Sequence, residues 1–270
     1  MHDAALPAVH WHRPWLHPLA GVGLTVMQGL CGGSVAHALN AAGEQHGCPV
    51  RFAAPDAAPP GEAYEAFIRR TAQVPTRDNL HDFFNGLVWL RFPQAKTALN
   101  RLQSEAIAAQ GVGAVRGPVR DAITVFDENG ALLLAPPAVA TVLWPALLAR
   151  DWHALFVTHR AWWAQAQLVL FGHALMEQLV SPRKPITAHV WVWPFEPAGS
   201  GADPVPALDA ALAADLSAER LSAKPFTPLP VLGVPGWWPD NEDPAFYADV
   251  TVFRPARRPV AAVVNFPGQP

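Results

Sequence analysis

From Pro14 to Gly43 the sequence contains no Asp, Glu, Lys or Arg. A stretch of this length without charge belongs in a membrane, in a targeting segment or in a protein core. Several glycines and polar residues such as Gln28 and Asn40 interrupt it, and each glycine weakens a helix by about 1 kcal/mol relative to alanine. The preceding residues also lack the positive charge of an export signal. The sequence therefore predicts a buried, glycine-rich N-terminal helix in a cytoplasmic protein, with no membrane partner.

The composition favours a globular protein with a sizeable core, because 51% of the residues are hydrophobic and 15% are charged. The net charge is −3 and the lysines and arginines are scattered, so we expect no nucleic-acid partner. The two cysteines, Cys31 and Cys48, have no metal-ligand spacing. We expect both to be reduced thiols, since disulfides are uncommon in the cytosol.

The clearest helical pattern runs from Thr76 to Gln110. Apolar residues recur there at intervals of three or four, and Pro93 suits the first turn of a second helix, which predicts a helical hairpin. A Pro/Ala-rich connector precedes it at Phe52–Gly61. Other helices are predicted at residues 62–71, 139–150, 160–180 and 208–221.

Two segments have the pattern of β-strands. Residues 123–134 are typical of a hairpin that turns at Asn129-Gly130. Asp127 and Glu128 are adjacent in that turn, where an Asp usually bonds its own backbone, so a turn role is favoured over acid/base catalysis. Residues 186–193 predict a buried strand. From Pro225 onward the chain is rich in proline, with tryptophan and other aromatic residues that anchor an irregular wrap on the core.

These elements predict an α+β fold: a predominantly helical single domain with a small antiparallel sheet and an irregular Pro/Trp-rich C-terminal wrap. Residues 1–60 are expected to form the apolar helical segment and its Pro-rich connector. Residues 61–224 are expected to form the helical core with the β-hairpin, and residues 225–270 the wrap.

Two polar groupings stand on otherwise apolar predicted helices. His81, Asp82 and Asn85 lie near the start of one helix, where they either cap it or point into a pocket, His81 and Asn85 sharing one face. His173 and Glu177 stand four residues apart on another helix. That spacing suits two ligands of one metal ion, and equally a buried hydrogen-bonded pair.

A further histidine, His189, interrupts the apolar strand at residues 186–193. Such a residue is more often part of the core than a ligand. His189 is nevertheless a candidate to complete a metal site with His81 and His173, and His159 is another candidate.

Several motifs of this sequence resemble a bacterial family known only as a domain of unknown function, and they extend from about Thr76 to Pro255. The resemblance implies an identity without a mechanism. It is carried by His81-Asp82-Phe83-Phe84-Asn85 with Phe92-Pro93, Lys96 and Leu99-Asn100, by Arg120-Asp121 with Thr124 and Phe126-Asp127-Glu128, by Phe171-Gly172-His173-Ala174-Leu175 with Glu177, and by Pro235-Gly236-Trp237, Asn241-Glu242 and Phe246-Tyr247.

The motifs of serine hydrolases, zincin proteases, P-loop proteins and dinucleotide-binding proteins are absent from the sequence. We expect a metal-assisted hydrolytic or related small-molecule enzyme in which His81, His173 and His189 bind a divalent metal ion. Asp82 or Glu177 would act as base or further ligand, and Asn85 would orient the substrate. The alternative is a non-enzymatic binding or scaffold protein whose tryptophans line a groove for a small molecule or a protein.

Overall fold

The structure, a computed structural model, describes residues 6–30, 33–111, 117–194 and 203–256. Cys31 therefore lies outside the described residues, while Cys48 is a free thiol. The contacts between residues group the chain into two compact units. The first unit comprises Met1–His12, Leu16–Asp127 and Asp203–Lys224, and the second comprises Arg13–Trp15, Glu128–Ala202 and Pro225–Pro270. The division at residues 60 and 224 stays a prediction.

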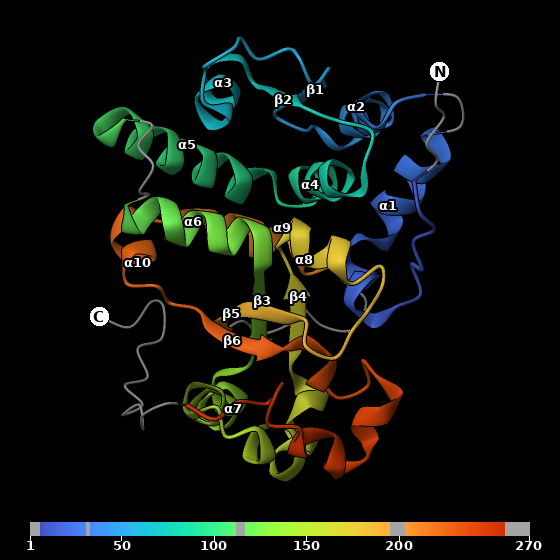
Figure 1. The fold of residues 1–270 in the computed structure, drawn as a ribbon, viewed down its shortest axis with the longest axis vertical. Coiled ribbons are helices and arrows are strands. Elements are labelled where there is room, and N and C mark those ends of the chain that lie inside the picture. Colours follow the sequence, from blue (N-terminus) through green and yellow to red (C-terminus); the bar gives the residue numbers. More distant parts are fainter. Residues whose placement is uncertain (1–5, 31–32, 112–116, 195–202, 257–270) are drawn as a thin grey trace. The chain divides into compact units, whose positions relative to one another are not determined.

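The first unit is built mainly from helices (Figure 1). A short parallel pair of strands, β1 and β2, joins Arg51–Ala53 to Gln73–Pro75. The helices are α1 (His17–Gly29), α2 (Val35–His46), α3 (Tyr64–Thr71), α4 (Leu80–Arg91), α5 (Pro93–Gln110), α6 (Pro118–Asn129, whose last two residues belong to the second unit), α9 (Val205–Asp215) and α10 (Ala218–Ser222).

The charge-free N-terminal segment forms two helices, α1 and α2, where a single helix was predicted. Leu19 and Leu39 are fully buried, and α1 and α2 both pack against α4. Gly86 of α4 permits this approach, because a Cβ atom at that position would lie 2.2 Å from the Leu39 side chain. α1 and α2 thus bury one face each within the first unit, while other positions such as Leu24, 47% exposed, lie at its surface. No helix in the described ranges has both the length and the apolar character to cross a membrane.

The two helices predicted between Thr76 and Gln110 are present as α4 and α5, which are separated by Phe92 alone, and α5 packs mainly on α3 and α9. Asn79 caps α4 by accepting a hydrogen bond from the backbone N–H of Asp82 at 2.8 Å. α5 has no cap of its own and begins at Pro93. The buried carboxylate of Asp209, in α9, instead accepts from the N–H groups of Gln94 at 3.0 Å and Ala95 at 2.8 Å.

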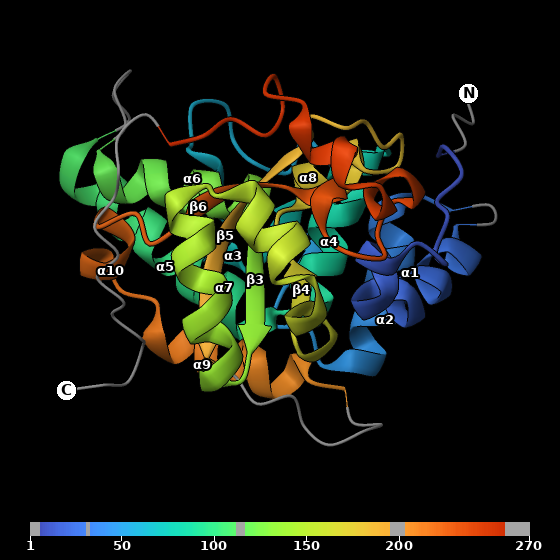
Figure 2. The same cartoon turned by 90° about the horizontal axis from the view of Figure 1, so that it is seen from below.

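The second unit contains a four-stranded mixed sheet in the order β4-β3-β5-β6. β3 pairs in parallel with β5 and antiparallel with β4, and β5 pairs antiparallel with β6. Helix α7 (Pro137–Ala149) contacts β3, β5 and β6 (Figure 2). The strands are β3 (Gly130–Ala135), β4 (Gln167–Leu170), β5 (Thr187–Pro194) and β6 (Thr227–Pro230), and helix α8 spans His173–Gln178. This unit also holds a π-helical turn at Ala154–Thr158 and short 3-10 helices at Arg160–Gln165, Val231–Gly233, Pro239–Glu242 and Pro244–Ala248. A further 3-10 helix, Pro14–Leu16, begins in this unit and has its last residue in the first.

The predicted β-hairpin is wrong. Its first arm belongs to helix α6, which buries Ala122, Ile123 and Phe126 on one face. Gly130 then begins β3, whose partners are β4 and β5. The run of β-branched and aromatic residues at 123–126 is compatible with a strand and with a helix. It forms a helix because that conformation buries Ile123 and Phe126 together.

The helix predicted at residues 160–180 is also wrong. The chain forms a 3-10 helix, strand β4 and the short helix α8 in its place. Leu168, Val169 and Leu170 are consecutive and all buried, as in a strand that is covered on both faces. The predominantly helical α+β fold is confirmed, whereas its main sheet is mixed and not purely antiparallel.

Candidate functional site

In the second unit, His173 lies beside Glu128. His173 is 4% exposed and is the first residue of α8, and Glu128 is half-buried in the last turn of α6. The distance from His173 Nε2 to Glu128 Oε2 is 3.7 Å. This separation is longer than a hydrogen bond, for which about 2.7–3.2 Å is typical. This distance suits an ion pair between the two side chains, and it also suits two ligands of one metal ion.

Gly172 makes this arrangement possible. A Cβ atom on residue 172 would lie 2.5 Å from both the Glu128 carbonyl oxygen and the Gly130 nitrogen. The N–H groups of Phe171 and Gly172 donate to the carbonyl oxygen of Gly130 at 3.0 and 2.8 Å. The segment that carries His173 is thus held against the end of α6, which carries Glu128.

The other two predicted site residues of this unit are Glu177 and His189, and each belongs to an element next to the His173–Glu128 pair. Glu177 is half-buried, one turn after His173 on α8. His189 is in β5, in register with Gly130 of β3. Burial lowers the pKa of His189, and the positive charge of Arg150 lowers it further. A neutral imidazole is the form that binds a metal ion.

In the first unit, α4 carries His81, Asp82 and Asn85. His81 is half-buried. The Asp82 carboxylate accepts from the Arg77 backbone N–H at 2.7 Å and from its guanidinium at 3.0 Å. This supports the capping interpretation of Asp82, because the carboxylate fixes the chain that leads into the helix. A common site for His81 and His173 stays a prediction.

Asn85 belongs to a buried polar network that surrounds Lys96. The Lys96 ammonium, in α5, donates to Asn85 Oδ1 at 3.0 Å and to Asp127 Oδ1 at 2.6 Å. It also lies 5.4 Å from the centre of the Trp89 ring, a distance suited to a cation–π interaction. Lys96 is 5% exposed, and these contacts satisfy a charge that would be costly to bury alone.

Tyr64, the first residue of α3, extends this network to the surface. Asn85 Nδ2 donates to the Tyr64 hydroxyl at 3.3 Å, and 41% of the residue is exposed. Burial of the hydroxyl raises the pKa of Tyr64, and the carboxylates of Glu65, Asp82 and Asp127 raise it further. The phenol therefore stays protonated at neutral pH and is able to donate a hydrogen bond.

Residues 50–257 match the model of a family described as protein of unknown function (DUF3025). The match covers more than half of the chain. The chain belongs to this family. No curated protein and no solved structure gave a match.

The DUF3025 region contains the His173–Glu128 pair, the Lys96 network and the residues on which the family resemblance was predicted. Helices α1 and α2 lie outside it.

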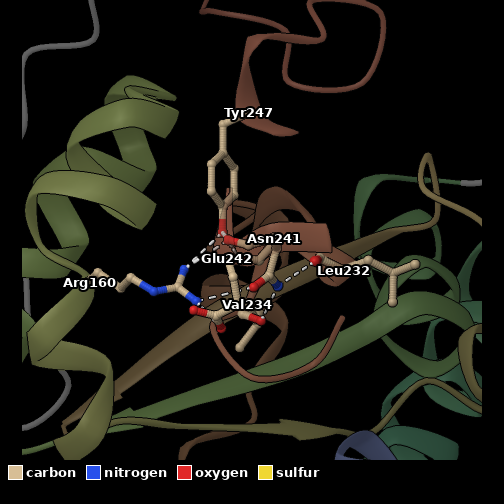
Figure 3. A network of polar contacts seen from close by, with 7 residues as sticks. Arg160, Leu232, Val234, Asn241, Glu242 and Tyr247 are labelled. Atoms are coloured by element: carbon tan, nitrogen blue, oxygen red, sulfur yellow. Dashed lines mark hydrogen bonds and ion pairs between the residues drawn. The ribbon is translucent and has the colours of Figure 1, made fainter. Parts of the chain in front are cut away.

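The C-terminal motif of the DUF3025 region forms another polar network in the second unit (Figure 3). The Arg160 guanidinium donates to the Asn241 carbonyl oxygen and the Tyr247 hydroxyl at 3.2 Å each, and to Glu242 at 2.5 Å. Asn241, which is fully buried, donates to the carbonyl oxygens of Leu232 and Val234 at 2.8 Å each. This network binds the irregular C-terminal chain to itself and to Arg160, which is a structural role.

Sequence reasoning assigned no role to Lys96 or Tyr64, and it placed Asp127 and Glu128 in a turn. A lysine between the apolar residues Ala95 and Leu99 was the available signal for Lys96. Its partner Asp127 is 31 residues away, and no local spacing connects the two. The pairing of Glu128 with His173 was missed for the same reason.

Proposed function

We propose that the protein is a metal-assisted hydrolytic enzyme, or a related enzyme that acts on a small molecule, with His173 and Glu128 among the ligands of a divalent metal ion. The observation that carries the proposal is the 3.7 Å between His173 Nε2 and Glu128 Oε2. Two atoms that each bind one zinc ion at about 2.0–2.2 Å are themselves about 3–4 Å apart. The separation fits shared ligation better than a direct hydrogen bond.

Each residue has a defined part in this proposal. A divalent metal, when bound, lowers the pKa of a bound water and polarises a carbonyl or phosphoryl oxygen. His173 offers Nε2 from a buried position, and Glu128 offers a carboxylate that is 35% exposed and can be reached by solvent. Glu177, one turn along α8, is the candidate base, and His189 is the candidate for a further ligand within this unit.

In the first unit, the Asn85 amide accepts a hydrogen bond from Lys96 and donates one to Tyr64, so it orients these two side chains. Asp82 holds the start of α4 through Arg77. We assign both to positioning.

The alternative function is a non-enzymatic binding or scaffold protein with a tryptophan-lined groove. Most tryptophans that would line it are core residues: Trp15, Trp89, Trp152, Trp163, Trp191 and Trp193 are each 7% exposed or less. Trp162 is 38% exposed. The buried positions favour the enzyme proposal, and the binding function is the expected conclusion if the metal test fails.

The test is metal binding by the full chain, purified without a histidine tag. Elemental analysis, followed by calorimetric titration of the metal-free protein with Zn²⁺ and Mn²⁺, should show one stoichiometric site. His173→Ala and Glu128→Gln should each weaken binding at least about tenfold, a loss seen even for residues that only support a ligand. His46→Ala, which removes an exposed histidine at the end of α2, should bind as the unaltered protein does.

Activity is then measured on activated carboxylic esters and phosphate esters, with and without the metal that binds. Circular dichroism of each variant shows whether it is folded. The proposal is wrong if the unaltered protein does not saturate with either metal, or if both variants bind as tightly as the unaltered protein.

A further inference from the structure

Arg120, the third residue of α6 in the first unit, is a buried charge with little compensation. It is 8% exposed, and a guanidinium has five N–H donors. The one hydrogen bond of this guanidinium within the described residues runs from Nη1 to the Gly111 carbonyl oxygen at 3.4 Å. The buried Nε makes none there. The neighbouring Asp121 is paired with Lys224 instead, at 2.6 Å.

The other buried charges of this unit have strong partners. Lys96 contacts Asp127 at 2.6 Å, and Asp82 contacts Arg77 at 3.0 Å. Asp209 accepts from two backbone N–H groups. Within the described ranges Arg120 differs from these three residues, because its guanidinium has neither an ion pair nor a short hydrogen bond.

This difference has an energetic consequence. Arginine stays protonated in proteins, and a buried charge without a counter-ion costs several kcal/mol. The contact with Gly111, at the C-terminal end of α5, gives Arg120 a favourable place near that helix dipole. The dipole amounts to only about half an elementary charge, however, and 3.4 Å is long for a hydrogen bond. The contact of Arg120 with the end of α5 thus offsets only a part of the free-energy cost of burying its charge.

We propose that Arg120 binds the oxyanion group of a small-molecule ligand, a carboxylate or a phosphate, beside the start of α6. The planar guanidinium fork matches both groups with two parallel hydrogen bonds. Helical side chains lean toward the N-terminus of their helix, so Arg120 leans toward the first turn of this twelve-residue helix. The backbone N–H groups of a first turn favour an anion as well. This inference does not depend on the proposed metal site.

The experiment titrates the full chain with inorganic phosphate in one arm and succinate in the other, at constant ionic strength. Binding is followed by the NMR signal of the arginine Nε–H groups and by the melting temperature. We expect saturable binding of at least one anion, and the arm that saturates at the lower concentration identifies the class of ligand. Arg120→Met should weaken that binding at least tenfold, and Arg120→Lys, which keeps the charge without the fork, should weaken it severalfold.

Arg101→Met is the matched control, because Arg101 is an arginine of α5 whose side chain is 41% exposed and paired with Glu105. It should bind anions as the unaltered protein does. Without anion, Arg120→Met should melt at the same temperature as the unaltered protein or higher, because it removes the uncompensated charge. The proposal is overturned if neither anion saturates, or if Arg120→Met binds as well as the unaltered protein. Should Arg120→Met fail to fold, unchanged binding in Arg120→Lys overturns it.

Discussion

His189 is a titratable side chain in a central strand of the mixed sheet. Because its pKa in the folded protein is lowered by burial and by Arg150, the unfolded chain binds more protons than the folded one around and below pH 6.5, the ordinary value for histidine. The stabilising contribution of neutral His189 is complete above that pH. It is lost as the pH falls through the ordinary value towards the lowered one.

We therefore predict that His189→Gln flattens the loss of stability between pH 7.5 and pH 5. The measurement is urea unfolding at several pH values, with the free energy of unfolding compared between the variant and the unaltered protein. His46→Gln, at an exposed position, should keep the original pH dependence. Identical pH profiles for His189→Gln and the unaltered chain would contradict the prediction.

At the scale of single residues, the sequence identified groups with unusual chemistry better than it identified their partners. His173, Asn85 and His189 were identifiable because each is polar within an apolar stretch. The partner of His173 in the second unit is Glu128, 45 positions earlier in the chain, and that of Asn85 is Lys96. Such partners are set by how helices pack, and that is not encoded in any local spacing.

Helix α5 depends on another helix for its N-terminal cap. Asp209 of α9 accepts hydrogen bonds from Gln94 and Ala95, while Phe92 at the cap position offers no side-chain hydrogen bond. Burial raises the pKa of Asp209 above its ordinary value, and these hydrogen bonds offset only a part of that rise. The carboxylate thus does for α5 what a local Ser or Asp does for most helices.

We predict that Asp209→Ala lowers the free energy of unfolding by about 1–2 kcal/mol or more, as loss of a cap does. Chemical denaturation gives this value. Asp209→Asn keeps one acceptor oxygen and should lose less stability than Asp209→Ala. If both variants are equally unstable, the carboxylate charge, and not the cap, is what stabilises α5.

The helical period of α4 and α5 was interpreted correctly and the strand at residues 186–193 is β5, whereas residues 123–126 and 168–170 were assigned to the wrong kind of element. α4 and α5 carry many apolar residues at helical spacing, and this pattern leaves one interpretation. Residues 123–126 and 168–170 are too short for the period to be decided. The packing of Phe126 into the core made the first a helix, and the pairing of Leu168 with Leu133 made the second a strand.

At the scale of the whole molecule, the C-terminal chain is a part of the core of the second unit. β6 pairs with β5. Phe253 is 2% exposed and contacts the rings of Phe156 and Tyr247, with centres 6.2 and 5.2 Å apart. Trp152 also donates a hydrogen bond to the Arg254 carbonyl oxygen at 2.9 Å.

We predict that truncation after Lys224 unfolds the second unit or lowers its melting temperature strongly. Each large apolar side chain that is lost from the core takes on the order of 2 kcal/mol with it. Calorimetry of the truncated and full chains measures the change, and truncation after Arg254, which keeps Phe253, is the control. An unchanged melting temperature after the first truncation is the result that would refute this.

The alternation of the two units along the chain has a consequence for synthesis on the ribosome. Residues 203–224 belong to the first unit, but the ribosome makes them only after residues 128–202 of the second. Asp209 and Gln94 are 115 residues apart, so at about 5–20 residues per second the start of α5 waits roughly 6 to 23 s for its acceptor. During that interval the nascent first unit is incomplete and exposes apolar surface that α9 later covers. A cell that makes this protein must keep that surface from aggregating until α9 emerges.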